Sequence, residues 1–176
     1  MTPPIHIACI GSRETPIDVL PWLIDRGAQI VSAGHVIVSG NAPGADQAWA
    51  RGGNRIDPGK VTLCLPWHGF EAGYVHAKNI TRTLDAPMRD SERHYYNLAA
   101  SLHPAWTNMP QGAQRLHARN MMIVEGARVV FGYEGAGGGT AMAFRIARHL
   151  QIPCHDVSDP KVRLKFDELL ERAVRR

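Results

Sequence analysis

Residues 131–140 read FGYEGAGGGT, five glycines between an apolar run and an amphipathic segment. Glycine lets backbone N–H groups turn toward a ligand, and the N-terminus of a following helix adds positive potential. The pattern therefore predicts a site that holds an anion, such as a phosphate, without a lysine. It is not a P-loop, because no Gly-Lys-Ser/Thr follows. The first predicted turn also lacks the Gly-x-Gly-x-x-Gly spacing of dinucleotide dehydrogenases.

Three other predicted strands are followed by turns that contain glycine together with small hydroxyl or ionisable residues. These turns read GSRE (11–14), SGNAPGAD (39–46) and PWHGFEAG (66–73). Ligands of parallel α/β sheets bind beyond the carboxyl ends of the strands, so we expect the turns to lie together. Arg13 is suited to clamp a phosphate or carboxylate there, and Thr140 adds a hydroxyl at a helix start.

The segment 115–127, RLHARNMMIVEGA, places two strongly polar residues on the apolar side of a predicted helix. Arg119 and Asn120 fall on one stripe with Leu116, Ile123 and Ala127. Buried guanidinium groups need partners, so one interpretation is that both residues point into the cleft and contact the ligand. The alternative is that the helix turns its other face inward, through His117, Met121 and Val124.

Five apolar runs must form the framework that positions these residues: 5–10, 35–40, 60–66, 127–133 and 152–157. Most are continuously apolar, which is typical of strands covered on both faces in a parallel sheet. Helical patterns lie between them, one opening at Thr15 and Pro16 and another ending at Gly52 and Gly53. The fold class predicted is α/β, a Rossmann-like three-layer sandwich with a mainly parallel sheet, in a single domain over 1–176.

Two further segments extend this framework. Residues 68–111 are too long for a simple connection, and we expect a helical insertion or lid before the fourth strand, with a helix over SERHYYNLAASLH. Residues 158–176 predict an amphipathic C-terminal helix with Ser158 or Asp159 as its N-cap and Pro160 as its first residue.

The net charge of +4 gives little support for a polyanion partner. The terminal segment 161–176 carries six basic and three acidic residues, so three of the four net charges belong to one predicted helix. The three cysteines have no C-x-x-C spacing and the nine histidines have no metal-ligand spacing, so we expect free thiols and no metal. No apolar run is long enough to cross a bilayer, and the N-terminus lacks a leader pattern. We therefore expect a cytoplasmic protein with no membrane partner.

The motifs together resemble the SLOG superfamily of Rossmann-like nucleotide-binding domains. They are ACIGSRE, VIVSGNAPGADQAWA, LHARNMMIVEGARVVFGYEGAGGGTAMAFRIA and QIPCHDV, and they cover 5–66 and 115–157. The superfamily includes the DNA-processing protein A domain and the cytokinin-activating phosphoribohydrolases. The chain looks most similar to the YspA-like branch, many of whose members occur in phages and bacterial conflict systems.

The resemblance implies a nucleotide or nucleotide-derived ligand on the glycine-rich loops. It implies that one group of residues binds this ligand: Gly11, Ser12, Arg13, Ser39, Gly40, Gly44, Asn120, Gly137, Gly138, Gly139 and Thr140. It implies no bound cofactor and a homodimer, since family members commonly pair. Nucleic acid is the less favoured partner.

One departure from the family pattern bears on catalysis. The phosphoribohydrolases carry a glutamate shortly after the Gly-Thr of the phosphate loop, whereas Thr140 is followed here by AMAF. Cleavage of an N-glycosidic bond needs a carboxylate, and the candidates that remain are Asp46, Glu71 and Glu134. Arg119, Asp46 and Glu71 are therefore the candidate catalytic residues of a nucleoside 5′-monophosphate N-glycosidase. The alternatives are a non-catalytic nucleotide sensor and a single-stranded DNA binder of the DNA-processing type.

Overall fold

The computed structural model describes residues 3–84, 90–135 and 138–176, which fold around one six-stranded sheet. The strand order is β4-β3-β2-β1-β5-β6, and every neighbouring pair is parallel. The strands are β1 (His6–Gly11), β2 (Val36–Ser39), β3 (Val61–Leu65), β4 (Ile80–Thr83), β5 (Val129–Tyr133) and β6 (Cys154–Asp156). The predicted Rossmann-like α/β class is confirmed.

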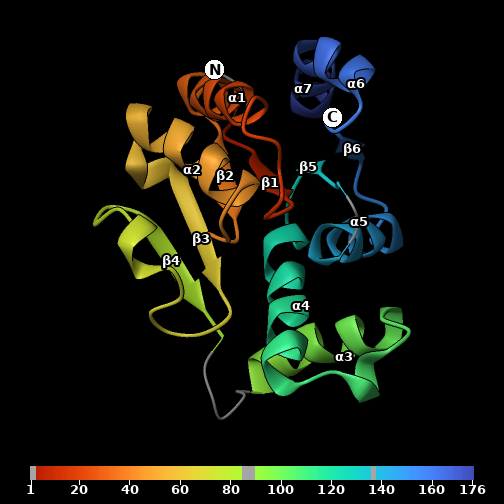
Figure 1. The fold of residues 1–176 in the computed structure, drawn as a ribbon. Helices are drawn as coiled ribbons and strands as arrows, with labels where there is room; N and C mark the ends of the chain where they lie inside the picture. The colour runs from red at the N-terminus through yellow and green to blue at the C-terminus, as the bar shows by residue number, and fades with distance from the viewer. Residues whose placement is uncertain (1–2, 85–89, 136–137) are drawn as a thin grey trace.

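Helices cover both faces of the sheet (Figure 1). On one face, α1 (Leu20–Ser32), α2 (Ala45–Ile56) and α7 (Phe166–Arg175) pack around Trp49 and Phe166. On the other face, α3 (Arg93–Leu102), α4 (Gln111–Val124) and α5 (Gly139–His149) share a second core. The central strands are buried on both sides, which explains why their sequences are continuously apolar.

The segment 68–111 differs from the helical insertion that was predicted, because it also contains β4. This strand pairs with β3 at the edge of the sheet, and its side chains are exposed or half-buried. An edge strand with little buried surface needs no apolar run, so its sequence, ITRT, carries no strand signal. The predicted helix in this segment is present as α3.

The glycines in α2 do not end the helix, contrary to the prediction. The helix continues through Gly52 and Gly53 to Ile56. A Cβ on Gly52 would overlap the carbonyl oxygen of Ile24, and one on Gly27 would overlap that of Trp49. Glycine is therefore required where α1 and α2 cross with their backbones in contact, and this packing outweighs its low helix propensity.

The structure confirms one of the predicted helix starts and contradicts another. The Asp159 carboxylate accepts a hydrogen bond from the Lys161 backbone N–H at 2.8 Å, so Asp159 is confirmed as the N-cap of α6 (Pro160–Leu164). The chain then breaks at Lys165 before α7, instead of forming one helix. Thr15 does not cap α1, which begins at Leu20. The Thr15 hydroxyl instead donates to the Ser12 carbonyl at 2.7 Å and so closes the turn after β1.

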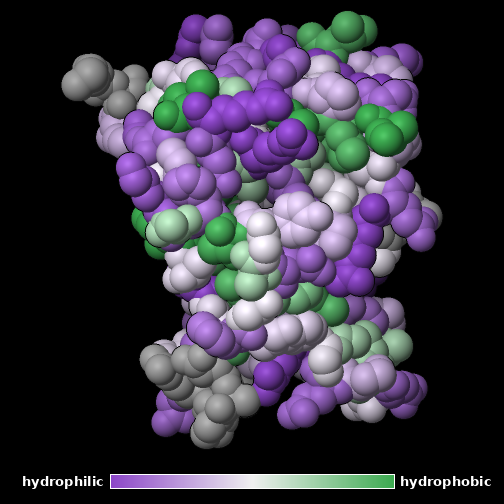
Figure 2. Space-filling view, turned by 60° about the vertical axis from the view of Figure 1, so that its left-hand side comes forward, coloured by the Kyte–Doolittle hydropathy of each residue, from purple (hydrophilic) through white to green (hydrophobic). Residues whose placement is uncertain are grey.

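None of the helices in the described ranges is long and apolar enough to cross a membrane. The surface in Figure 2 is mainly hydrophilic, with apolar residues in small separate groups rather than one continuous patch. Such scattered exposure is ordinary for a protein surface.

Candidate functional site

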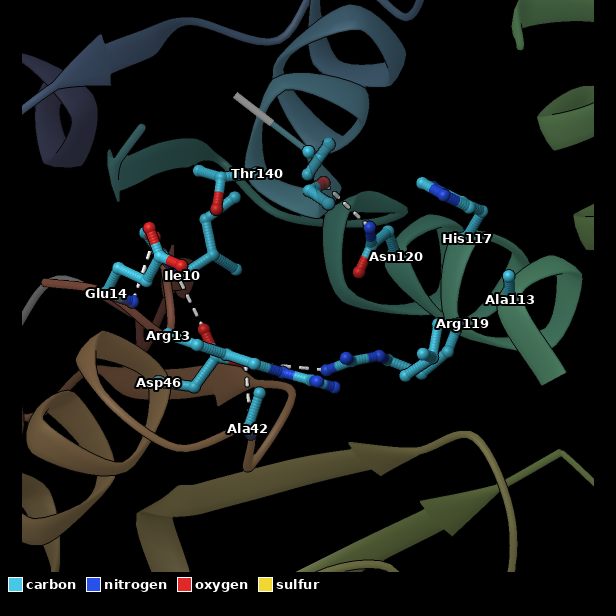
Figure 3. A pocket seen from close by; sticks show the side chains of 16 residues that line it. Ile10, Arg13, Glu14, Ala42, Asp46, Ala113, His117, Arg119, Asn120 and Thr140 are labelled. Carbon is cyan, nitrogen blue, oxygen red and sulfur yellow. Dashed lines mark hydrogen bonds and ion pairs between the residues drawn. The ribbon is translucent and has the colours of Figure 1, made fainter. Parts of the chain in front are cut away.

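A cavity of about 400 Å³ lies beyond the carboxyl end of β1, and four segments line it (Figure 3). The end of β1 and the turn that follows contribute residues 10–14, and the loop before α2 and the first turn of that helix contribute Ala42 and Asp46. The other two segments are α4 and the start of α5. The α4 residues are Ala113, Leu116, His117, Arg119 and Asn120, and the α5 residues are Gly138, Gly139, Thr140 and Ala143. Three of the four turns expected at one sheet edge are thus brought together.

Asp46, in the first turn of α2, has both carboxylate oxygens engaged. Oδ1 accepts a hydrogen bond from the Gly11 backbone N–H at 2.9 Å, and Oδ2 accepts one from the Ala42 backbone N–H at 3.3 Å. Oδ2 also pairs with the Arg119 guanidinium at 3.5 Å. Burial raises the pKa of Asp46, while Arg119 and the two backbone N–H groups oppose that rise. The carboxylate therefore ties three segments of the site to one another.

Arg119 is the buried cation of the site. It enters from α4, is 5% exposed, and passes over Gly40, where an added Cβ would overlap its Nη1. Burial lowers the pKa of its guanidinium, Asp46 opposes this, and the charge of Arg13 adds to it. Its Nε has no hydrogen-bond partner in the described part of the chain. Arg119 therefore places a buried positive charge in the wall of the cavity.

Arg13 supplies a second positive charge at the mouth of the same cavity. Its side chain is exposed, and Figure 3 shows it extending toward Arg119. The two guanidinium groups repel each other, and the Asp46 carboxylate beside Arg119 offsets part of that repulsion. The arrangement therefore favours an anionic ligand at this end of the cavity.

The start of α5 forms another side of the cavity. Gly138, the N-cap residue, has φ 78°, a left-handed conformation that favours glycine, and no side chain among the described residues caps the helix. The buried Asn120 amide donates to the Gly139 carbonyl at 2.9 Å, and this bond holds the helix start against α4. Thr140 is buried beside it. Uncapped N–H groups at a helix N-terminus attract a phosphate.

Several residues predicted to bind the ligand do not line the cavity. Ser39 is buried, and its hydroxyl donates to the Cys9 carbonyl at 2.6 Å. Gly44 is the N-cap residue of α2 with φ 87°, and Gly40 makes room for Arg119. Glu71, predicted as catalytic, is also absent from the lining, and its carbonyl accepts from the Asn41 amide at 3.1 Å. Gly137 lies outside the described residues.

Sequence reasoning did not assign seven of the residues that line the cavity, and three of these bring a polar group to it: Ala42, Glu14 and His117. Ala42 acts through its backbone N–H, so its side chain gives no signal. Glu14 belongs to the GSRE turn and lies exposed at the rim. His117 lies two residues before Arg119 and was considered only as part of the alternative stripe. Within the described ranges, no group of three His, Cys, Asp or Glu side chains is placed to hold a metal.

His117 is a neutral histidine in this setting. Burial, followed by the charges of His103, Arg119 and Arg145, lowers the pKa of His117 from 6.5 to about 4. Its Nδ1 is buried and has no hydrogen-bond partner in the part of the chain that the structure describes. The folded protein therefore carries an uncharged imidazole in the cavity wall at neutral pH.

The lowered pKa of His117 predicts a pH-dependent stability. Between pH 4 and 6.5 the unfolded chain binds a proton at His117 that the folded chain does not, so the free energy of unfolding rises with pH in this range. We expect His117→Gln to remove about 1–2 kcal/mol of that rise, a figure reduced for partial solvent screening. Urea unfolding at pH 5 and pH 7 measures it, with the exposed His68→Gln as control. An unchanged pH dependence in His117→Gln would contradict the prediction.

Two solved structures share the fold of this chain. One is DNA processing protein A from Helicobacter pylori, described for its single-stranded DNA binding mode, with a TM-score of 0.62 and 19% identity over 97% of this chain and 74% of that chain. The other is TM1055, a structural-genomics target, with a TM-score of 0.57 and 14% identity over 86% of this chain and 72% of that chain. No family model and no curated protein matches. At these identities the likeness establishes the fold alone, and membership of the SLOG superfamily and of its YspA-like branch stays a prediction.

Proposed function

We propose that this protein binds a nucleotide or nucleotide-derived small molecule in the cavity, with a phosphate at the N-terminus of α5. The observation that carries the proposal is the buried, positively charged Arg119 side chain in the wall of the cavity. The uncapped start of α5 and the exposed Arg13 border the same cavity. Each of these groups attracts an anion, and together they favour a ligand with a phosphate.

The geometry supports binding more than turnover. A general base needs a carboxylate oxygen free to accept a proton, whereas both oxygens of Asp46 are already hydrogen-bonded or paired. Glu71 does not line the cavity. Glu14 does, but as an exposed rim residue. We therefore propose a binding or sensing module, and N-glycosidic hydrolysis of a nucleoside 5′-phosphate is the alternative that the assay must test.

The decisive experiment exposes the purified protein to nucleoside mono-, di- and triphosphates and NAD-related nucleotides. Thermal shift measures binding, and chromatography measures free base. A shift without free base is the expected result. Base release that is lost in Arg119→Ala would make the protein a hydrolase. Retention on single-stranded DNA with no nucleotide-induced shift would overturn the proposal in favour of a DNA binder.

Arg13→Ala gives a sharper test of the phosphate subsite. Because Arg13 is exposed, its loss should leave the free energy of unfolding within about 0.5 kcal/mol of wild type. The dissociation constant of the bound nucleotide should rise about tenfold, the value of one charge-assisted hydrogen bond. Isothermal titration calorimetry measures it. Arg55→Ala, an exposed arginine of α2 that does not line the cavity, is the matched control and should bind as wild type does.

A further inference from the structure

The cavity has a charged end and an apolar end. Arg13, Arg119 and the start of α5 form the charged end. Ala113, Leu116 and His117 line the cavity from the first turns of α4, and Figure 3 shows Ala113 and His117 across the cavity from Arg13. A ligand whose phosphate lies at the charged end must therefore extend its uncharged part along α4.

Of the three described residues that line this apolar end, only His117 has side-chain nitrogens that can form hydrogen bonds. Its ring packs against that of His103, with ring centroids 4.6 Å apart, so a residue of the segment 68–111 fixes its orientation. Nδ1 is buried and has no hydrogen-bond partner in the described part of the chain. A proton on Nδ1 would be a buried donor without an acceptor, which costs more free energy than a buried lone pair without a donor. The proton therefore resides on Nε2, and Nε2–H is the donor that His117 can offer.

We propose that His117 determines ligand specificity by donating a hydrogen bond from Nε2 to an acceptor on a nucleobase, a ring nitrogen or a carbonyl oxygen. Leu116 and Ala113 supply the apolar surface on which the base lies. The cavity volume is at the small end of the range for small-molecule sites, so it suits one nucleoside 5′-monophosphate better than a dinucleotide. This inference rests on the proposed function, because it presumes that a phosphate occupies the charged end.

The test compares two kinds of ligand that share the sugar and the phosphate and differ in the base. Ribose 5-phosphate and the four nucleoside 5′-monophosphates are titrated by calorimetry into wild type, His117→Ala and His117→Gln. Wild type should bind at least one mononucleotide about tenfold more tightly than ribose 5-phosphate. His117→Ala should lose that preference, while its affinity for ribose 5-phosphate changes less than about twofold, since no base contacts the mutated position. His117→Gln, which keeps a neutral donor, should restore part of the preference.

Each outcome separates the two proposals. If wild type binds none of the nucleotides in the thermal-shift panel, the proposed function fails and this inference fails with it. If it binds only di- or triphosphates or NAD-related nucleotides, the proposed function stands and this inference is overturned. If wild type prefers a mononucleotide and His117→Ala keeps the same preference, the phosphate site stands and the role of His117 is overturned. Equal loss of affinity for ribose 5-phosphate and the mononucleotide in His117→Ala also overturns it, because that pattern indicates a structural role only.

Discussion

Asp46→Ala is expected to lower the free energy of unfolding by about 3–5 kcal/mol, the cost of removing one partner of a buried ion pair. The change leaves the Arg119 guanidinium buried without a counter-charge, and it leaves the backbone N–H groups of Gly11 and Ala42 without acceptors. Urea unfolding at pH 7 measures the effect. Asp18→Ala, at an exposed position, is the control and should stay within about 0.5 kcal/mol of wild type.

A second variant distinguishes loss of the ion pair from general damage to the loop. In Asp46→Ala/Arg119→Met the unpaired charge is gone and an apolar chain fills part of its volume. We expect the double variant to be more stable than Asp46→Ala. Replacing both buried charges costs less free energy than leaving one buried charge without its partner. Additive destabilisation in the double variant would show that the two residues act separately. Nucleotide binding should be lost in both variants, since Arg119 is absent or misplaced.

Gly40→Ala is expected to have the next largest effect. The backbone of Gly40 is not in the left-handed region, so strain is not the cause; the cause is that the new methyl group would overlap Nη1 of Arg119. The guanidinium must leave its place beside Asp46, which we expect to cost about 1–3 kcal/mol of stability. Because the anion-binding group moves, the dissociation constant for nucleotide should rise about tenfold or more. Unfolding and calorimetry on the same preparation measure both quantities.

Gly112→Ala is the matched control for Gly40→Ala. Gly112 lies in the first turn of α4, and an added Cβ there meets nothing within 4 Å. Alanine is the better helix former, so this variant should be as stable as wild type or more stable by up to about 1 kcal/mol. Its nucleotide affinity should be unchanged. A Gly40→Ala variant that behaves like Gly112→Ala would mean that Arg119 can bind its ligand from another position.

The sequence by itself determined the class of the fold, and it predicted the kind of site. Continuously apolar runs such as 127–133 predicted a parallel sheet, because a strand covered on both faces has no polar side. The glycines before Thr140 predicted an anion at a helix N-terminus. The stripe that combines Leu116 with Arg119 and Asn120 predicted two buried polar residues, and both are buried, at 5% and 7% exposure. These are local properties, visible within a few turns or a few residues of chain.

Only the tertiary structure decided which distant groups meet. Arg119 pairs with Asp46 across 73 residues of sequence, and the Asp46 carboxylate thereby links three segments of the cavity wall. The packing of the elements also places the Arg119 guanidinium against Gly40 and brings the backbone of Gly52 in α2 into contact with α1. It also placed His117 in the cavity and Glu71 outside the lining. No periodicity encodes such contacts, because they depend on how the elements pack and not on the pattern within any one element.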